Sequence, residues 1–176
     1  MRVFLLAGKA RSGKGEVAKV IKNYYDMKKQ KTVITEYSKY IKLFAKEMTD
    51  WDGNSATKPR KFLQDMGVYI RKNLEEPEFL IRRMKEDLKI YEKFYDNCII
   101  SDIRYPNEIE EMKKINPNII SIFIINEHGN YDLSKEEANH ETEHALDNYH
   151  EFDFVIVNEE KELLEQKLMG LLKEID

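Results

Sequence analysis

The apolar residues of this chain gather in short runs that are separated by longer stretches of helical periodicity. The five strand-like runs are Val3–Ala7, Thr32–Thr35, Cys98–Ser101, Ile119–Ile125 and Phe152–Val157. Apolar residues three or four positions apart predict helices over Lys14–Lys28, Lys39–Met48, Pro59–Lys72, Pro77–Phe94, Pro106–Ile115 and Glu159–Ile175. Strands that alternate with helices predict an α/β fold with a parallel sheet covered on both faces.

Two polar segments, Thr49–Thr57 and Glu127–Asn139, interrupt this alternation without a strand pattern of their own. Ligands of α/β sheets bind beyond the carboxyl ends of the strands, so each segment is a candidate lid or substrate cover. A surface loop is an equally good interpretation of each. The chain of 176 residues has no internal repeat and no low-complexity linker, and we therefore expect one domain over residues 1–176.

The composition of the chain argues against several kinds of binding partner and cellular location. The formal net charge is −4, which argues against a nucleic-acid polymer or an anionic membrane surface as a partner. No apolar run approaches the ~20 residues of a membrane span, and the run at Val3–Ala7 is too short for a signal peptide. Cys98 is the only cysteine and heads an apolar run, which predicts a buried, inert thiol and a cytoplasmic protein.

A glycine-containing segment directly follows the first predicted strand and leads into the first predicted helix. It reads G-x-x-x-x-G-K, and between a strand and a helix this motif predicts a phosphate-binding P-loop. The backbone N–H groups of such a loop and the positive end of the helix bind polyphosphate, and Lys14 would reach its outer phosphates. The expected nucleotide-binding residues are Gly8, Lys9, Ala10, Arg11, Ser12, Gly13, Lys14, Gly15 and Glu16.

A magnesium ligand is expected at the end of the third predicted strand, where Asp102 and Arg104 follow Ser101. Asp102 can hold the water shell of Mg²⁺ or orient the attacking oxygen, and Arg104 can pair with phosphate. The alternative is an Asp–Arg surface pair that opens the next helix. Gly15 stands where many P-loops carry a Ser or Thr that binds the metal, so we expect Asp102 to hold Mg²⁺ through water.

The helix predicted over Pro59–Lys72 carries a polar stripe. Arg60, Gln64, Gly67 and Arg71 fall on one side of it at helical spacing. Two arginines and an amide around a glycine suit the wall of an anion site. A solvated polar face would have the same pattern.

A motif near the C-terminus predicts a different function, a zinc site. His140, Glu141 and His144 match H-E-x-x-H, in which two histidines bind zinc, and His150 stands where a third ligand would be. The residues before His140 are too polar for a buried catalytic helix, and Asp147 replaces the glycine of the longer motif. We therefore keep a zinc hydrolase as a less favoured alternative.

Several motifs in order along the chain resemble the nucleoside monophosphate kinase branch of the P-loop proteins. They are G-K-A-R-S-G-K at 8–14, R-x-x-L-Q-x-x-G-x-x-x-R at 60–71, S-D-I-R-Y-P-N-E at 101–108 and H-E-T-E-H-A-L-D-N-Y at 140–149. The likeness is greatest to the deoxynucleoside monophosphate kinases, and the C-terminal stretch is also similar to animal-type phosphomevalonate kinases. The resemblance implies a three-layer P-loop fold with a five-stranded parallel sheet.

The same resemblance implies a function: transfer of the γ-phosphoryl group of ATP–Mg²⁺ to a phosphate monoester, most simply a (deoxy)nucleoside monophosphate. It implies an acceptor-binding helical region at about 38–95, a lid at about 127–145 and catalytic roles for Lys14, Arg11, Asp102 and Arg104. The resemblance also implies that Glu143 is a structural acid or an acid on the substrate side of the site. The expected acceptor-binding residues are Tyr37, Ser38, Arg60, Gln64, Arg71, Arg104 and Glu143.

One departure from the related kinases concerns the lid. Related lids carry arginines that neutralise the transferring phosphoryl group, whereas Glu127–Asn139 contains only Lys135. Arg11 is the first candidate to supply that charge, followed by Arg104, Arg82 or Arg83. Alternative functions are a phosphomevalonate kinase and a nucleotide-binding protein without catalysis. A homodimer is compatible with the sequence.

Overall fold

A computed structural model describes residues 1–54, 56–74, 76–116, 118–127, 134–159 and 161–176. Its centre is a five-stranded, fully parallel sheet with the strand order β2-β3-β1-β4-β5. The α/β class predicted from the sequence is thereby confirmed. The strands are β1 Arg2–Ala7, β2 Thr32–Thr35, β3 Asn97–Ile103, β4 Ile119–Asn126 and β5 Phe154–Asn158.

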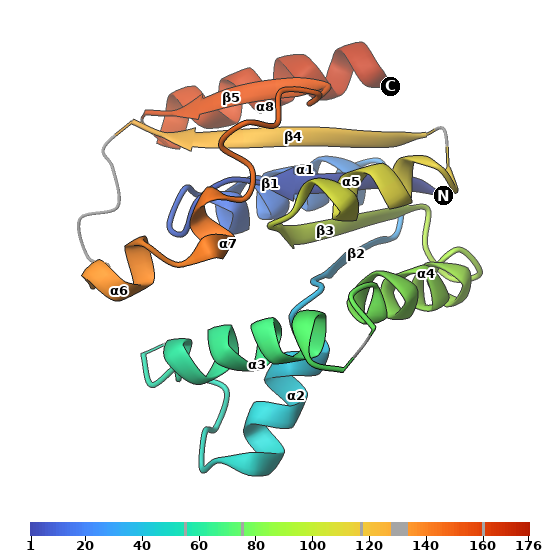
Figure 1. The fold of residues 1–176 in the computed structure, drawn as a ribbon. Coiled ribbons are helices and arrows are strands. Elements are labelled where there is room, and N and C mark those ends of the chain that lie inside the picture. Colours follow the sequence, from blue (N-terminus) through green and yellow to red (C-terminus); the bar gives the residue numbers. More distant parts are fainter. Residues whose placement is uncertain (55, 75, 117, 128–133, 160) are drawn as a thin grey trace.

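Helices cover both faces of the sheet (Figure 1). The two helices α1 and α8 pack together on one face, while α4 and α5 lie on the other. A further pair, α2 and α3, forms a layer below the β2 edge (Figure 1). The longer helices are α1 Lys14–Met27, α2 Lys39–Met48, α3 Arg60–Lys72, α4 Phe79–Tyr91, α5 Pro106–Lys113 and α8 Lys161–Ile175.

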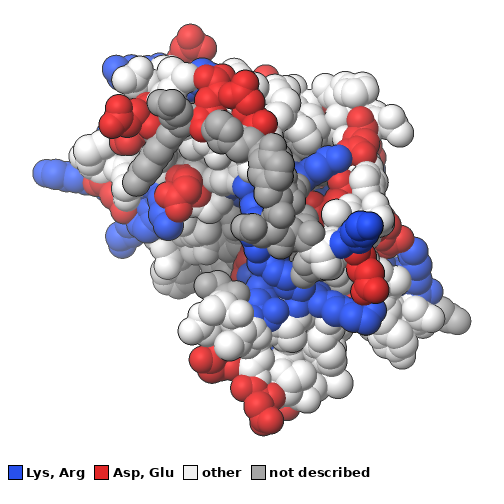
Figure 2. Space-filling model, turned by 90° about the vertical axis from the view of Figure 1, so that its left-hand side faces the viewer, with Lys and Arg blue, Asp and Glu red and all other residues white. Residues whose placement is uncertain are grey.

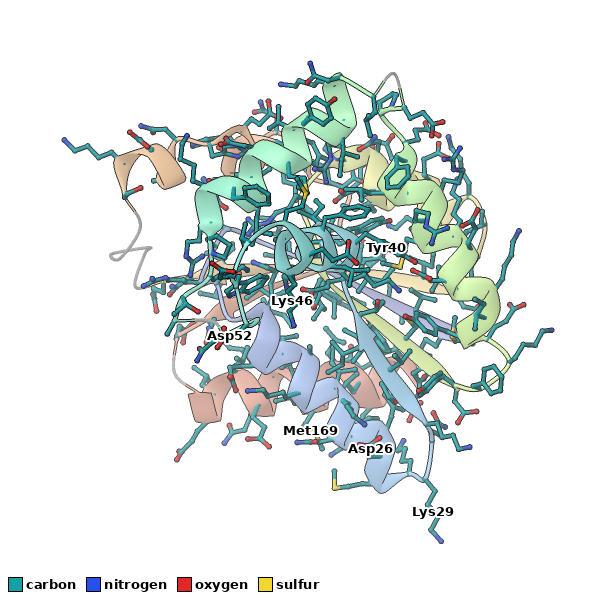
Figure 3. The ribbon with its side chains drawn as sticks, turned by 90° about the horizontal axis from the view of Figure 1, so that it is seen from below. Asp26, Lys29, Tyr40, Lys46, Asp52 and Met169 are labelled. Atoms are coloured by element: carbon teal, nitrogen blue, oxygen red, sulfur yellow. The ribbon has the colours of Figure 1, made fainter. Side chains whose placement is uncertain are left out.

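The core follows from the two-residue period of β1. Val3 and Leu5 pack on the α4 and α5 side, whereas Phe4 and Leu6 pack on the α1 and α8 side, and all four are fully buried. A strand that is apolar at every position must have both faces covered, which is the three-layer arrangement observed. Figure 3, seen from below, shows Tyr40 on the side of α2 that faces α4, where its hydroxyl donates to Asp87 at 2.9 Å.

The periodicity missed two short helices, α6 Lys135–Ala138 and α7 Glu141–His144. A single helical turn is too short to repeat an apolar position, so it has no detectable period. Residues 128–133 of the expected lid lie outside the described part of the chain. The described residues of the other polar segment, Thr49–Thr57, contain neither helix nor strand.

Two further expectations can be compared with the structure. Cys98 is fully buried, and burial raises the pKa of its thiol to about 12, as expected for an inert cysteine. Among the residues described, no helix combines the length and hydrophobicity needed to cross a bilayer.

Candidate active site

A cleft of about 510 Å³ opens at the carboxyl edge of the sheet, between the P-loop, the start of α2, α3 and α7. On this side of the molecule, Figure 2 shows Lys and Arg side chains gathered in the lower centre of the surface. Gly8 and Lys9 do not line the cleft, although both belong to the P-loop. The predicted residues that do line it are Ala10, Arg11, Ser12, Gly13, Lys14, Gly15, Glu16, Tyr37, Ser38, Arg60, Gln64, Arg71, Asp102, Arg104 and Glu143.

The P-loop path requires glycine at two positions. Gly8 has φ 143° and Gly13 has φ 98°, both in the region that L side chains avoid. A Cβ at Gly8 would lie 2.4 Å from the carbonyl oxygen of Ile124, and a Cβ at Gly13 would lie 2.3 Å from the amide nitrogen of Asn158. The loop therefore passes β4 and β5 at distances that only glycine allows.

Asparagines at the ends of β4 and β5 hold this loop from outside. The side-chain amide of Asn126 donates to the Arg11 carbonyl at 3.1 Å, and that of Asn158 donates to the Ser12 carbonyl at 3.1 Å. Arg11 itself has φ 59°, a left-handed conformation that costs a non-glycine residue about 1–2 kcal/mol. The sequence analysis missed both asparagines, although each stands at the carboxyl end of a predicted strand.

Lys14 lies over its own loop. Its ammonium donates to the carbonyls of Gly8 at 2.9 Å and Lys9 at 2.6 Å. Burial, and then the nearby charge of Arg104, lowers the pKa of Lys14 to about 7. An anion in the cleft would favour the charged ammonium and raise this pKa again.

Asp102 connects β3 with the start of α2. Its Oδ1 accepts from the Tyr37 N–H at 2.7 Å, and its Oδ2 accepts from the Ser38 N–H at 2.9 Å. Each oxygen keeps a lone pair that can accept from a water of a hydrated Mg²⁺. On the P-loop side, a Cβ at Gly15 would meet no heavy atom within 4 Å, so there is open space for such a hydrated ion. The residues present therefore fit magnesium held through water.

Glu143 joins three elements at one side of the cleft. Its Oε2 accepts from the Ala10 N–H at 2.6 Å, and its Oε1 pairs with Arg104 at 2.8 Å. Glu143 is only 7% exposed. A single carboxylate on α7 thus fixes both the P-loop and an arginine that follows β3.

Arg71 is held in a similar way by Glu108, which the sequence analysis gave no role. The two side chains are 3.0 Å apart, and the Arg71 guanidinium lies 4.5 Å from the centre of the Tyr105 ring. Glu108 is 2% exposed, and its second oxygen accepts from the backbone N–H groups of Arg104 and Tyr105. Burial raises the pKa of Glu108, while Arg71 opposes that shift. Its position three residues after Tyr105 and two after Pro106 matches a helix start.

Arg82 and Arg83, which were candidates to replace the arginines of the lid, lie outside the cleft. Arg82 pairs with Glu76 at 2.7 Å, and Arg83 pairs with Glu86 at 2.9 Å. Both belong to α4, and neither lines the cleft. Arg11 and Arg104 remain at the cleft, together with two lysines that the sequence analysis did not single out, Lys42 and Lys58.

The H-E-x-x-H motif has local contacts instead of a shared metal position. The His140 ring accepts from the Thr142 N–H at 3.3 Å and so caps α7. The ring nitrogens of His144 contact Asp147 at 2.9 Å and the Ala138 carbonyl at 3.1 Å, and Glu141 binds Lys72 and Tyr105. Across the described ranges, no group of three or more His, Cys, Asp or Glu side chains is arranged to hold a metal ion.

Comparison with known proteins gives a family and a set of similar folds. A family model described as deoxynucleotide monophosphate kinase matches residues 25–168. This range begins after the P-loop, so the match and the P-loop geometry are independent observations. No curated protein sequence matches the chain significantly.

Three solved structures share the fold across nearly the whole chain. A sugar kinase from Janibacter sp. HTCC2649 has a TM-score of 0.61 at 9% identity, with 98% of this chain and 95% of that chain covered. An APS kinase from Mycobacterium tuberculosis has a TM-score of 0.54 at 12% identity, with 98% and 96% covered. A shikimate kinase from Aquifex aeolicus has a TM-score of 0.53 at 14% identity, with 98% and 96% covered. At such identities the likeness shows a common P-loop kinase fold.

Proposed function

The chain belongs to the deoxynucleotide monophosphate kinase family, and from this premise we propose that it phosphorylates a (deoxy)nucleoside monophosphate with ATP. One observation carries the proposal: the P-loop, Asp102, the arginines of α3 and Arg104, which follows β3, line a single cleft. Phosphoryl transfer requires a site that binds polyphosphate next to a site that binds a second anion. The P-loop side of this cleft and the arginines on its other side supply positive groups suited to these two anions.

In the proposed reaction an oxygen of the acceptor phosphate attacks the γ-phosphorus of ATP. A new O–P bond forms, the bond to the β–γ bridging oxygen breaks, and ADP leaves with that electron pair. The acceptor phosphate is already anionic at neutral pH, so the step needs positioning and charge neutralisation more than a base. A nucleoside diphosphate and ADP are the products.

The residues of the cleft have separate roles in this proposal. Lys14 and the loop N–H groups bind the β- and γ-phosphates, and Arg11 lies beside them. Asp102 holds the waters of Mg²⁺, which supplies positive charge to the phosphates when it is bound. Arg60, Arg71 and Arg104 bind the acceptor phosphate, while Gln64 and Ser38 contact the rest of the acceptor. Tyr37 was also predicted to contact the acceptor, but it is 2% exposed and its hydroxyl donates to the Glu108 carbonyl at 3.2 Å, so it supports the cleft wall from behind. Glu143 positions Arg104 against the P-loop, as their 2.8 Å contact supports.

The test is ADP release from ATP–Mg²⁺ with a panel of acceptors. The panel contains the deoxynucleoside and nucleoside monophosphates, phosphomevalonate, dephospho-coenzyme A and a control without acceptor. Turnover with nucleoside monophosphates is expected, and the ratio of deoxy to ribo rates identifies the preferred sugar. Turnover with phosphomevalonate alone would contradict a nucleoside monophosphate acceptor and identify the protein as a phosphomevalonate kinase. Tight ATP binding without any turnover would contradict the proposed reaction and favour a non-catalytic nucleotide-binding protein.

A further inference from the structure

The ammonium of Lys58 differs in its contacts from the charged groups of Lys14, Lys42, Arg71 and Arg104, which line the same cleft. Lys58 stands just before α3, is half-buried and lines the same cleft as Lys14. Within the described part of the chain, its ammonium makes no hydrogen bond or ion pair. A half-buried ammonium without a partner is unfavourable unless a ligand compensates its charge.

Four other cations that line the cleft have partners within the protein. Lys14 donates to two carbonyls, Arg71 pairs with Glu108, and Arg104 pairs with Glu143. Lys42, which also lines the cleft, pairs with Glu36. The protein therefore pairs three of these charges with carboxylates and gives Lys14 two neutral carbonyl partners, whereas it leaves the Lys58 ammonium to a ligand.

The electrostatic surroundings of Lys58 point to an anion as that ligand. Burial lowers the pKa of Lys58, and the positive charges of Lys42 and Arg60 lower it further, against the opposite effects of Glu36 and Asp102. Both ammoniums line the same cleft, and the positive charge of Lys58 contributes, after burial and Arg104, to the lowered pKa of Lys14. An anion between them would be attracted by both.

We propose that Lys58 contacts the γ-phosphoryl group during transfer and neutralises its charge from the side opposite Lys14. The inference rests on the proposed function and deepens it. While the acceptor oxygen bonds to the γ-phosphorus and ADP leaves with the electron pair, negative charge lies on the three equatorial oxygens, and no proton moves to or from Lys58. Lys58 thereby replaces the arginine that the segment Glu127–Asn139 lacks.

The test compares Lys58→Met, which removes the charge and keeps much of the chain length, with Lys58→Arg, which keeps the charge. Lys61→Met is the matched control, because Lys61 is exposed on α3 and pairs only loosely with Asp65 at 3.7 Å. We expect Lys58→Met to lower kcat at least about 100-fold while the KM values for ATP and acceptor change little. Lys58→Arg should restore kcat to within about tenfold of the original enzyme. Lys61→Met should match the original enzyme, and circular dichroism checks the fold of each variant.

Two results would overturn this assignment alone, with the kinase reaction intact. One is an unchanged kcat in Lys58→Met, and the other is a loss confined to the KM of the acceptor. If the original enzyme phosphorylates no acceptor, the proposed function fails, and calorimetric binding of ATP and ADP then decides the role of Lys58. A contact to the γ-phosphoryl group predicts that Lys58→Met lowers the ratio of ATP to ADP affinity, and an unchanged ratio would exclude it.

Discussion

The two walls of the cleft are held in place by different interactions. The P-loop wall is fixed by backbone geometry, with glycines at left-handed or closely approached positions and strand-end asparagines on its carbonyls. The opposite wall, which contains Arg71 and Arg104 and which we propose binds the acceptor, is called the acceptor wall. It is fixed by side-chain charges, chiefly the contacts of Glu108 with Arg71 and of Glu143 with Arg104. Backbone geometry resists change, whereas a few ion pairs can be altered one at a time.

The helices behind the two walls differ in how many residues they bury. The helix α1, which follows the P-loop, buries five side chains against the sheet and α8. The helices α2 and α3 together bury four residues, namely Ile41, Ala45, Gly67 and Ile70. Ile41 and Ile70 join the core cluster on the α4 and α5 side of the sheet, whereas the α1 residues join the cluster on the α8 side. Both walls therefore rest on the hydrophobic core, and they differ in the interactions that fix the residues facing the cleft. Substitutions that affect one wall and leave the other unchanged test this difference.

The largest effect is expected from Lys14→Ala on the nucleotide wall. In the proposed mechanism the Lys14 ammonium contacts the β- and γ-phosphates, so its loss should lower kcat by several orders of magnitude, because the charge would act on the transition state. The fold should persist, and circular dichroism with a thermal melt would show it. Lys19→Ala on the exposed face of α1 is the matched control. Normal turnover by Lys14→Ala with acceptor present would rule out the proposed mechanism.

The second effect is expected from Glu108→Gln on the acceptor wall. Removal of this buried charge leaves the Arg71 guanidinium uncompensated and should lower the free energy of unfolding by about 3 kcal/mol. The KM for the acceptor should rise, while the Kd for ATP should stay close to that of the original enzyme. Urea unfolding, steady-state kinetics and calorimetry measure these three quantities.

The exposed Glu110, two positions along α5, supplies the control variant Glu110→Gln. It should change none of the three quantities. If Glu108→Gln weakened ATP binding as strongly as acceptor binding, the two walls would not be independent.

A smaller effect is expected from Gly13→Ala. The added Cβ would meet the Asn158 amide at 2.3 Å, and the left-handed φ adds strain of about 1–2 kcal/mol, which corresponds to roughly tenfold weaker ATP binding. Gly170→Ala is the control, because a Cβ there meets nothing within 4 Å and alanine favours the α8 helix by up to about 1 kcal/mol. ATP titrations and thermal melts of both variants would separate conformational strain from a general effect of the extra methyl group.

The smallest predicted effect is the uptake of protons when ATP binds. With the pKa of Lys14 at about 7, the free lysine is roughly nine-tenths neutral at pH 8, and bound phosphate should recharge it. ATP binding at pH 8 should therefore take up protons, measurable by calorimetry in buffers of different ionisation enthalpy. Lys14→Met should reduce the uptake to the share of Lys58, whose pKa is also lowered.

The same lowered pKa has a consequence for stability, with a definite sign. Between about pH 7 and the ordinary lysine value of 10.5, the unfolded chain binds more protons at Lys14 than the folded chain. The contribution of Lys14 to the free energy of unfolding therefore rises with pH across that window. Urea unfolding of the original protein and of Lys14→Met at pH 7 and pH 9 measures it, and equal slopes with pH would contradict the lowered pKa.

Local patterns in the sequence were enough for the strands, the long helices and the P-loop. Each depends on residues that are neighbours in the chain: alternating or continuous apolar runs, three-to-four spacing, and glycines before a helix. The polar stripe of α3 was predicted in the same way, and all four of its members line the cleft. Periodicity did not reveal α6 and α7, since each is a single turn.

The tertiary structure alone decided which charges meet. Asp102 holds backbone N–H groups about 65 positions earlier in the chain, and Glu143 reaches the P-loop across 133 positions. The partner of Arg71 is Glu108, 37 positions away, and the Lys58 ammonium has no hydrogen-bond or ion-pair partner among the residues described. These relations depend on how the helices pack around the sheet and on how water is excluded there. A sequence states which charges are available, but only the fold determines which of them are buried, which are paired and which remain for a ligand.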